Sequence, residues 1–337
     1  ADAALRRFLE RVFDGATFAI TPERFEPAYR ELEQAAVDGR AETVVVALLR
    51  GLTTEAEQVP FGDGALLAPA ECLEDLPPDP ARSADESPAV DVAIAPGDEP
   101  DGVERTLERL NDIQTAMRLF APGIGFSPLV WMRSGGSPWR PLIGPVRGRA
   151  GGAVVIAADQ EDELRAFCNL VARRRPIQGE LAWALERFEL GCERDTALVA
   201  LTDHLLALRA LLEPEGPESE LMPIRLAVLC AVATERDALA IRVARAVALE
   251  QAIVAGLEPI PVGAVELARE IEGHLRALLR DVVCGHLALD LAELADELIG
   301  GGHAPPAEAA PDERPAARPA FAPYAPVSTP GRGELFP

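Results

Sequence analysis

Hydrophobic residues recur along the chain with two different spacings, and each spacing predicts a different kind of element. At residues 2–13 and 103–120 the apolar side chains lie three or four positions apart, which predicts helices with one apolar face. Apolar runs with many β-branched residues at 43–49 and 89–95 predict strands instead, and a shorter apolar run follows at 65–68. The first part of the chain therefore predicts a mixture of helices and strands.

Start signals predict two more helices in the same part of the chain. Thr21 is a suitable N-cap and Pro22 suits the first helical position, so we expect a helix that runs to about Val37. Asp159 is the expected N-cap of another helix, which ends near Arg174.

Three segments carry few signals of regular structure. Residues 76–102 are rich in Pro, Asp, Glu and Ser, which predicts a long loop around the second strand candidate. Residues 124–157 are rich in Gly and Pro and predict irregular strands and turns. From Gly300 onward the chain is rich in Pro and poor in apolar residues, which predicts a disordered tail.

Beyond Pro176 the helical spacing is nearly continuous. Residues 180–299 carry turn signals only near 214–217 and 259–263, which predicts a helical bundle with short connections. The expected fold class is therefore α+β and mostly α. The expected organisation is a mixed α/β N-terminal domain at 1–175, a helical bundle at 176–299 and a disordered tail at 300–337.

The charge balance limits the classes of partner and of chemistry. The 337 residues include 32 basic and 55 acidic side chains, which gives a formal net charge of −23. An acidic protein repels nucleic acid at long range, so the net charge disfavours RNA as a partner. Every basic residue is Arg, so a phosphate-binding P-loop and a Schiff-base lysine are both excluded. The absence of Lys, whose codons are AT-rich, is typical of a GC-rich bacterium.

Cysteine usage and apolar run lengths point to an intracellular protein. The five Cys are widely spaced and none forms Cys-x-x-Cys, so neither a disulfide framework nor a zinc ribbon is expected. We expect these cysteines to be buried, reduced side chains. No apolar run reaches the roughly 18–20 residues that a membrane helix needs, and the N-terminus lacks the layout of a signal peptide. We therefore expect a cytoplasmic protein without a membrane segment.

Basic residues are concentrated in one stretch despite the acidic balance. A positive surface there would suit RNA or nucleotide binding without cleavage, with Trp131 or Trp139 stacking on bases. The competing interpretation is that these side chains pair with acidic residues elsewhere in the chain. The candidate nucleic-acid-binding residues are Arg133, Arg140, Arg147, Arg149, Arg173, Arg174 and Arg175.

Histidine and cysteine positions give little support for a metal. Asp203 and His204 lie in a Leu-rich helical stretch, where we expect a partly buried pair with local hydrogen bonds. Cys284 and His286 offer two ligands, but no third cluster lies nearby in sequence. We therefore predict no metal site and no cofactor.

Four segments of the helical part follow one another in a specific order: Glu186–Leu190, the Leu-rich helix Ala200–Leu212, Ile224–Ala231 and the helix end Glu250–Gly256. This order resembles the Apea-like branch of the HEPN superfamily, the higher eukaryote and prokaryote nucleotide-binding domains. Upstream, Thr115–Gly123 is similar to the segment that commonly precedes the bundle in those proteins. The resemblance implies a HEPN-like bundle, a homodimer and membership of a bacterial defence or stress system.

Active HEPN proteins share an Arg-x(4–6)-His motif that makes them metal-independent ribonucleases, usually across a dimer interface. In the Apea-like branch the motif reads approximately Arg-Ser-x-x-x-His-Gly at the end of this helix. Here Glu250 stands in place of the Arg, Ala255 in place of the His, and Gly256 is retained. The resemblance therefore implies a degenerate site that lacks both the phosphate-binding cation and the proton carrier.

Three functional hypotheses follow from these observations. The leading hypothesis is a non-catalytic HEPN-like interaction protein, homodimeric and with an unidentified protein partner. An alternative is a metal-independent RNA endonuclease with a shifted site at Arg269 and His274, or at Arg280 and His286, since both pairs fit the motif spacing. A second alternative is RNA or nucleotide binding without cleavage. The sequence leaves all three open.

Overall fold

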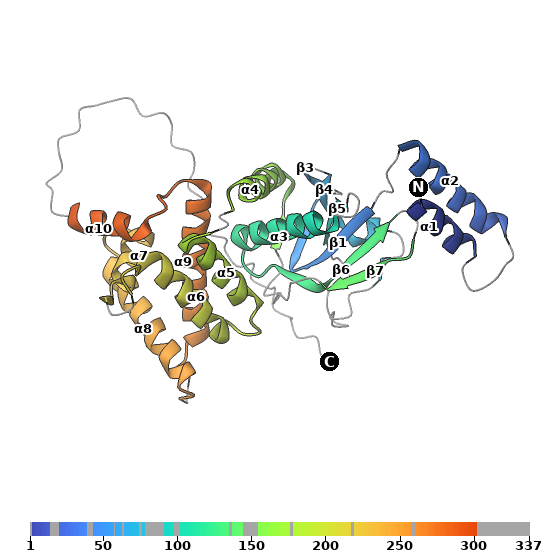
Figure 1. Ribbon diagram of the computed structural model, residues 1–337. Helices are drawn as coiled ribbons and strands as arrows, with labels where there is room; N and C mark the ends of the chain where they lie inside the picture. Colours follow the sequence, from blue (N-terminus) through green and yellow to red (C-terminus); the bar gives the residue numbers. More distant parts are fainter. Residues whose placement is uncertain are drawn as a thin grey trace, which may run out of the picture. The chain divides into compact units, whose positions relative to one another are not determined.

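The computed structural model describes residues 2–301 with gaps and shows a mostly helical chain with one main sheet (Figure 1). The gaps are residues 14–19, 39–42, 57, 63, 74–75, 78–90, 98–101, 135–136, 144–153, 176–177, 217–218 and 258–259. The tail that we predict to be disordered lies outside the described residues from 302 onward.

The described residues up to 174 contain both helices and strands, and those after 174 contain helices only. The helices are α1 (Asp2–Val12), α2 (Pro22–Asp38), α3 (Gly102–Phe120), α4 (Glu161–Arg174), α5 (Glu180–Glu193), α6 (Ala197–Leu212), α7 (Met222–Cys230), α8 (Arg236–Val254), α9 (Ala264–Cys284) and α10 (Leu291–Gly301). The strands are β1 (Thr43–Arg50), β2 (Leu52–Thr54), β3 (Val59–Gly62), β4 (Ala65–Pro69), β5 (Asp91–Gly97), β6 (Gly125–Ser134), β7 (Arg140–Ile143) and β8 (Val154–Ile156).

Six strands form an antiparallel sheet in the order β3-β4-β5-β1-β6-β7, while β2 and β8 form a separate parallel pair. Strand β1 is central, because Val45 lies opposite Ala95 of β5 on one side and Met132 of β6 on the other. Its residues 45–49 are all buried, which explains why its sequence is apolar throughout. Helix α3 packs along β5 and β1 (Figure 1).

Helix α6 is the centre of the helical part. Its apolar residues surround the whole helix, and it packs against α5, α7, α8 and α9. The helix begins at Thr196, whose side-chain oxygen accepts a hydrogen bond from the Val199 amide at 3.3 Å. Its contacts with four helices make α6 the scaffold on which the other helices of the bundle are placed.

Buried arginines connect the helical part to α3. Nε of Arg276 in α9 donates to the backbone carbonyl of Arg118 in α3 at 2.8 Å. The Arg118 side chain is itself buried and lies 3.4 Å from the Glu193 carboxylate. The hydrophobic core is continuous from Val45 to Leu275, so it does not break at the expected domain boundary between residues 175 and 176. That boundary stays a prediction.

The expected fold class, α+β and mostly α, is confirmed. The details differ in three places. Gln160 occupies the N-cap of α4, and Asp159 lies in the short 3-10 turn before it, so the predicted cap was wrong by one residue. Residues 125–134 form one ten-residue strand, whose register against β1 shifts between Ala47 and Leu49, where we expected irregular strands and turns. Helix α10 continues through Gly300, the first residue of the expected tail.

Within the described residues, no helix combines the length and the apolar character needed to cross a membrane.

Candidate functional site

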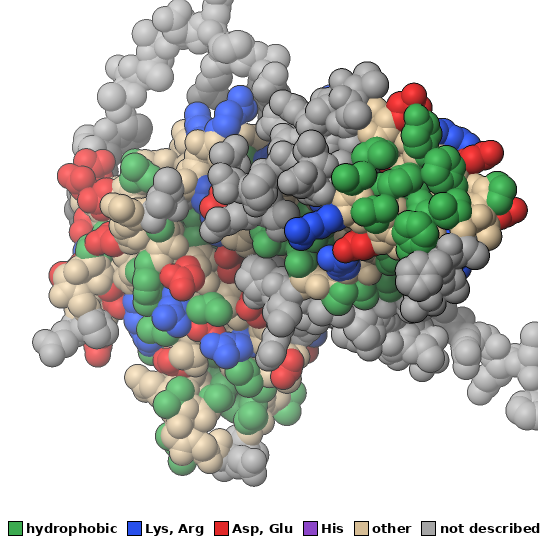
Figure 2. Space-filling model, turned by 45° about the vertical axis from the view of Figure 1, so that its right-hand side comes forward, with side chains coloured by type: hydrophobic (Ala, Val, Ile, Leu, Met, Phe, Trp, Pro, Cys, Tyr) green, Lys and Arg blue, Asp and Glu red, His purple; other side chains and the backbone are tan. Residues whose placement is uncertain are grey.

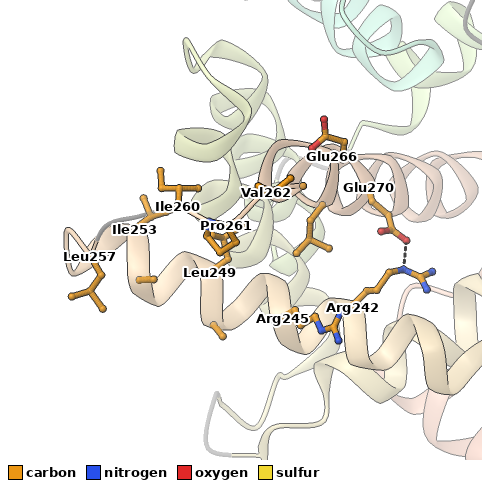
Figure 3. A pocket seen from close by; sticks show the side chains of 15 residues that line it. Arg242, Arg245, Leu249, Ile253, Leu257, Ile260, Pro261, Val262, Glu266 and Glu270 are labelled. Atoms are coloured by element: carbon orange, nitrogen blue, oxygen red, sulfur yellow. Dashed lines mark hydrogen bonds and ion pairs between the residues drawn. The ribbon is translucent and has the colours of Figure 1, made fainter.

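An apolar groove of about 650 Å³ lies between α8 and α9, at the end where the two helices are joined (Figure 3). Its walls come from α8 between Arg242 and Ile253, the connecting loop and α9 between Ala264 and Glu270. The apolar side chains that line it include Leu249, Ile253, Leu257, Ile260, Val262 and Leu267.

The loop between α8 and α9 holds apolar side chains in solvent. Helix α8 stops because Gly256 adopts a left-handed conformation with φ of +68° immediately after Ala255, and Gly263 with φ of +84° precedes α9. Between these two glycines, Leu257 is 63% exposed and Val262 is fully exposed. Single exposed apolar residues are common, but residues that continue the lining of an apolar groove mark an interaction surface.

Charged side chains stand at the other end of the groove. Nε of Arg242 donates to the Glu270 carboxylate at 2.8 Å (Figure 3). Nε2 of His274 lies 3.6 Å from the same carboxylate. Burial lowers the pKa of His274, and the Arg242 charge acts in the same direction, while Glu270 opposes them. Arg245 and Glu266 also line the groove, are exposed, and form no ion pair among the described residues.

The positions of the degenerate motif have structural roles. Glu250 is only 8% exposed, and its carboxylate accepts a hydrogen bond from Nη2 of Arg209 in α6 at 3.1 Å. Ala255 is the exposed C-cap of α8, and Gly256 provides the left-handed residue that ends the helix. Glu250 thus joins α8 to α6, and the retained glycine has a backbone role that does not depend on catalysis.

The two alternative Arg/His pairs lie in α9 and at its end. Arg269 is exposed, whereas His274 is half-buried against Glu270. Arg280 lies in the last turns of α9, and His286 follows the helix end at Gly285, with its Nδ1 3.6 Å from the Asp281 carboxylate. Each candidate histidine therefore lies close to an acidic side chain of α9, an arrangement that repels a phosphate group.

The structure distributes the arginines of the basic stretch over two regions. Arg133 in β6 stacks on Trp139 with 4.5 Å between the guanidinium carbon and the ring centre, and Arg140 lies in the neighbouring strand β7. Arg147 and Arg149 lie outside the described residues. Trp131 is buried against the sheet, so its ring is not available for stacking on a base.

The other three arginines lie at the end of α4 and make contacts within the chain. Nη1 of Arg174 donates to the Cys284 carbonyl at 2.8 Å and so caps the end of α9. Arg175 is 3.0 Å from the Asp112 carboxylate and 3.6 Å from that of Glu189. Nε of Arg173 donates to the Asn169 carbonyl at 3.1 Å. Of these three arginines, only Arg175 contacts acidic side chains, as the competing interpretation expects, while Arg173 and Arg174 bind backbone carbonyls.

Asp203 and His204 are part of the core of the bundle. The buried Asp203 carboxylate is 2.6 Å from Nε of Arg194 and 3.4 Å from Nη1 of Arg187. The His204 ring packs against Phe188 and against the backbone of Gly191 in α5. This polar site is more deeply buried than expected, and its charged partners come from α5 and the turn that follows it.

The five cysteines are free thiols. Burial raises the pKa of Cys168 and of Cys230 to about 12 and that of Cys192 to about 11. Cys72 is exposed, contrary to the expectation of burial. Among the described residues, no three His, Cys, Asp or Glu side chains are grouped so that they could hold a metal ion.

The groove residues were not recognised as a site from the sequence. The Pro and Gly content of residues 259–263 predicts only a turn there. The signal that marks them is the apolar character of the connection, since Leu257, Ile260 and Val262 occur where loops between surface helices are usually polar.

Comparison of this chain with family models, with curated proteins and with solved structures gives no match. The HEPN resemblance therefore stays a prediction from the pattern of residues.

Proposed function

We propose that the chain is a non-catalytic HEPN-like interaction protein, that it forms homodimers, and that its helical bundle binds a protein partner in the α8–α9 groove. The observation that carries the proposal is the apolar groove itself, which adjoins the helix end where the resemblance places a degenerate motif. A role in bacterial defence or stress follows from the resemblance alone.

The environment of Glu250 supports the absence of catalysis. A ribonuclease of this type needs a cation that contacts phosphate and a histidine that transfers a proton. At the corresponding positions the chain has a buried carboxylate paired with Arg209 and an exposed methyl group at Ala255. A carboxylate does not stabilise negative charge on a phosphate, and a methyl group cannot transfer a proton.

The groove fits the apolar stripe of an amphipathic helix. Leu249, Ile253 and Leu267 supply apolar walls, and an entering helix would bury them together with the exposed loop residues. Arg245 on α8 and Glu266 on α9 stand on opposite walls. The partner helix is therefore one with acidic residues along one flank of its apolar stripe and basic residues along the other.

The test compares partners captured by the full chain and by two matched variants in the same cell extract. Ala252→Glu places a charge inside the groove, while Ile241→Glu places the same charge on α8 at a side chain that is 55% exposed and does not line the groove. We expect the partners cross-linked to the wild type to be lost from A252E and kept by I241E. Equal loss or equal retention in both variants contradicts the groove assignment.

A separate assay tests the absence of catalysis. Fluorescent single-stranded RNA is incubated with the purified chain in the presence of EDTA. We expect no cleavage above that of a buffer control. Cleavage that disappears in His274→Ala or His286→Ala overturns the proposal in favour of the ribonuclease alternative.

A further inference from the structure

A small pocket of about 260 Å³ lies between helix α1 and the strands β6 and β7, away from the α8–α9 groove. Helix α1 contributes two arginines and a glutamate, each strand contributes one residue, and a serine comes from the segment before β7. These residues are Arg6, Arg7, Glu10, Met132, Arg140 and Ser137.

Local geometry places the charged groups around a common volume. Met132 of β6 lies directly opposite Arg140 of β7, so both side chains lie on the same face of the sheet. Glu10 follows Arg6 by four residues and Arg7 by three, so these three side chains share one side of α1. The pocket therefore gathers arginines from two distant segments of the sequence.

The pocket arginines lack the acidic partners that other arginines have. Within the described part of the chain, Arg6, Arg7 and Arg140 form no ion pair. Arg11 and Arg225, by contrast, each lie against a carboxylate. Basic and acidic side chains are interspersed over much of the face that Figure 2 shows. The pocket is thus a positive site on an acidic protein.

The charges of the pocket define the charge of a ligand that would stabilise it. Three guanidinium groups around one small volume repel one another, because arginine stays protonated in proteins. The Glu10 carboxylate offsets one of these charges, so three positive charges and one negative charge leave two positive charges. An anion with two negative charges cancels that remainder.

A phosphate monoester has this charge and the matching geometry. It carries close to two negative charges at neutral pH and has three acceptor oxygens. The planar fork of a guanidinium group donates two hydrogen bonds to a pair of such oxygens, and the Ser137 hydroxyl offers a further donor.

The size and the net charge favour a small molecule over a nucleic acid. At about 260 Å³ the pocket is smaller than the roughly 300–1,000 Å³ that drug-sized ligands occupy. A phosphodiester carries one charge per phosphate, which leaves the pocket incompletely neutralised, and the net charge of −23 repels a polyanion such as RNA.

We propose that this pocket binds a small phosphate monoester, whose phosphate group is held by Arg6, Arg7 and Arg140. The site lies outside the helical bundle and does not depend on the groove or on the homodimer of the proposed function.

The test titrates the full chain with methyl phosphate in a calorimeter at pH 8, where the monoester is a dianion, with the ionic strength held constant by sodium chloride. We expect one site per chain. Arg7→Ala/Arg140→Ala is expected to raise the dissociation constant at least about tenfold, because it removes two of the three cations. An absence of binding by the wild type overturns the proposal.

The matched control is Arg30→Ala/Arg165→Ala, which removes two arginines that do not line the pocket and so changes the net charge equally. We expect its dissociation constant to stay within about twofold of the wild type. An equal loss of affinity in both double variants shows a general charge effect and overturns the site.

A change that strengthens binding excludes misfolding as the cause of the result. Glu10→Gln removes the opposing carboxylate and is expected to lower the dissociation constant about three- to tenfold, whereas Glu33→Gln on α2 is expected to leave it unchanged. An unchanged or raised dissociation constant in E10Q contradicts the proposal.

The class of ligand is tested with dimethyl phosphate, a diester that carries one negative charge. We expect it to bind at least about tenfold more weakly than methyl phosphate, because it leaves one positive charge of the pocket uncancelled. Equal affinity for the two compounds overturns the assignment to a phosphate monoester.

Discussion

The Glu250 carboxylate of α8 and the Arg209 guanidinium of α6 form an ion pair at 3.1 Å across two helices of the bundle. Because Arg209 occupies this place, an acidic residue is the complementary choice at position 250. The resemblance to HEPN proteins implies an arginine there, and an arginine would face another arginine. The acidic residue at position 250 and the packing of α8 on α6 are thus consistent with each other.

Glu250→Arg is expected to destabilise the protein by about 3 kcal/mol, since it replaces a mostly buried ion pair by two like charges. The double variant Arg209→Glu/Glu250→Arg restores opposite charges and should recover more than half of that loss. Urea unfolding followed by circular dichroism measures both. Glu266→Arg, at an exposed acid of α9, is the control and should change stability by less than about 0.5 kcal/mol. Equal effects at positions 250 and 266 would contradict the importance of the pair.

Rebuilding the family motif is expected not to create a ribonuclease. In Glu250→Arg/Ala255→His the new guanidinium lies next to Arg209 and away from solvent, so it is poorly placed for a phosphate. We expect no cleavage of single-stranded RNA in EDTA by the folded variant. Metal-independent cleavage by this variant would show that the geometry around position 250 is compatible with the motif.

Gly191→Ala is expected to destabilise the protein by about 2–3 kcal/mol through overpacking. A Cβ atom at Gly191 would lie 2.2 Å from Nε2 of His204, whose ring is buried and cannot move aside. Gly273→Ala in α9 is the control, because nothing lies within 4 Å of its Cβ and alanine favours a helix by up to about 1 kcal/mol. Thermal unfolding measures the stability of both variants. If Gly191→Ala leaves the stability unchanged, that result contradicts the close approach of α5 to α6.

Stability is expected to fall below neutral pH through His274. Its pKa is lowered in the folded state by burial, so the unfolded chain binds the proton more tightly. The contribution is therefore complete above the ordinary histidine pKa and is lost as the pH falls toward the lowered folded value. Urea midpoints between pH 5 and 7.5 should show a smaller decline in His274→Gln than in the wild type. Identical declines would contradict this assignment.

The cysteines are expected to differ in their rates of alkylation. Cys72 is exposed, whereas burial raises the pKa values of Cys168 and Cys230 to about 12 and that of Cys192 to about 11. Limited treatment of the native protein with iodoacetamide, followed by peptide mass spectrometry, should label Cys72 first. In urea all five should react, which controls for their intrinsic reactivity. Early labelling of Cys168 in the native protein would contradict its burial.

Local patterns in the sequence predicted most of the elements, because the spacing of apolar side chains follows the geometry of one helix or strand. Thr21 and Pro22 marked the start of α2 correctly, and the apolar run at 43–49 lies in β1. The same kind of signal was less exact at Asp159, because neighbouring residues can begin a helix equally well and the 3-10 turn shifts the cap by one residue.

The candidate site depended on contacts that no local pattern contains. Arg209 and Glu250 are 41 residues apart, and Arg118 meets Arg276 across 158 residues. The groove forms between α8 and α9 beside their connecting loop, for which the sequence predicted only a turn.

By itself, the amino-acid sequence determined the fold class, the helical character of residues 180–299, the acidic balance and the lack of any lysine chemistry, since each of these is a property of neighbouring residues or of composition. The tertiary structure alone decided that Glu250 is a buried partner of Arg209, that the basic residues at the end of α4 hold other helices, and that an apolar groove opens between α8 and α9. The physical reason is that ion pairs and grooves form where distant segments pack together, and the free energy of that packing is set by the whole chain.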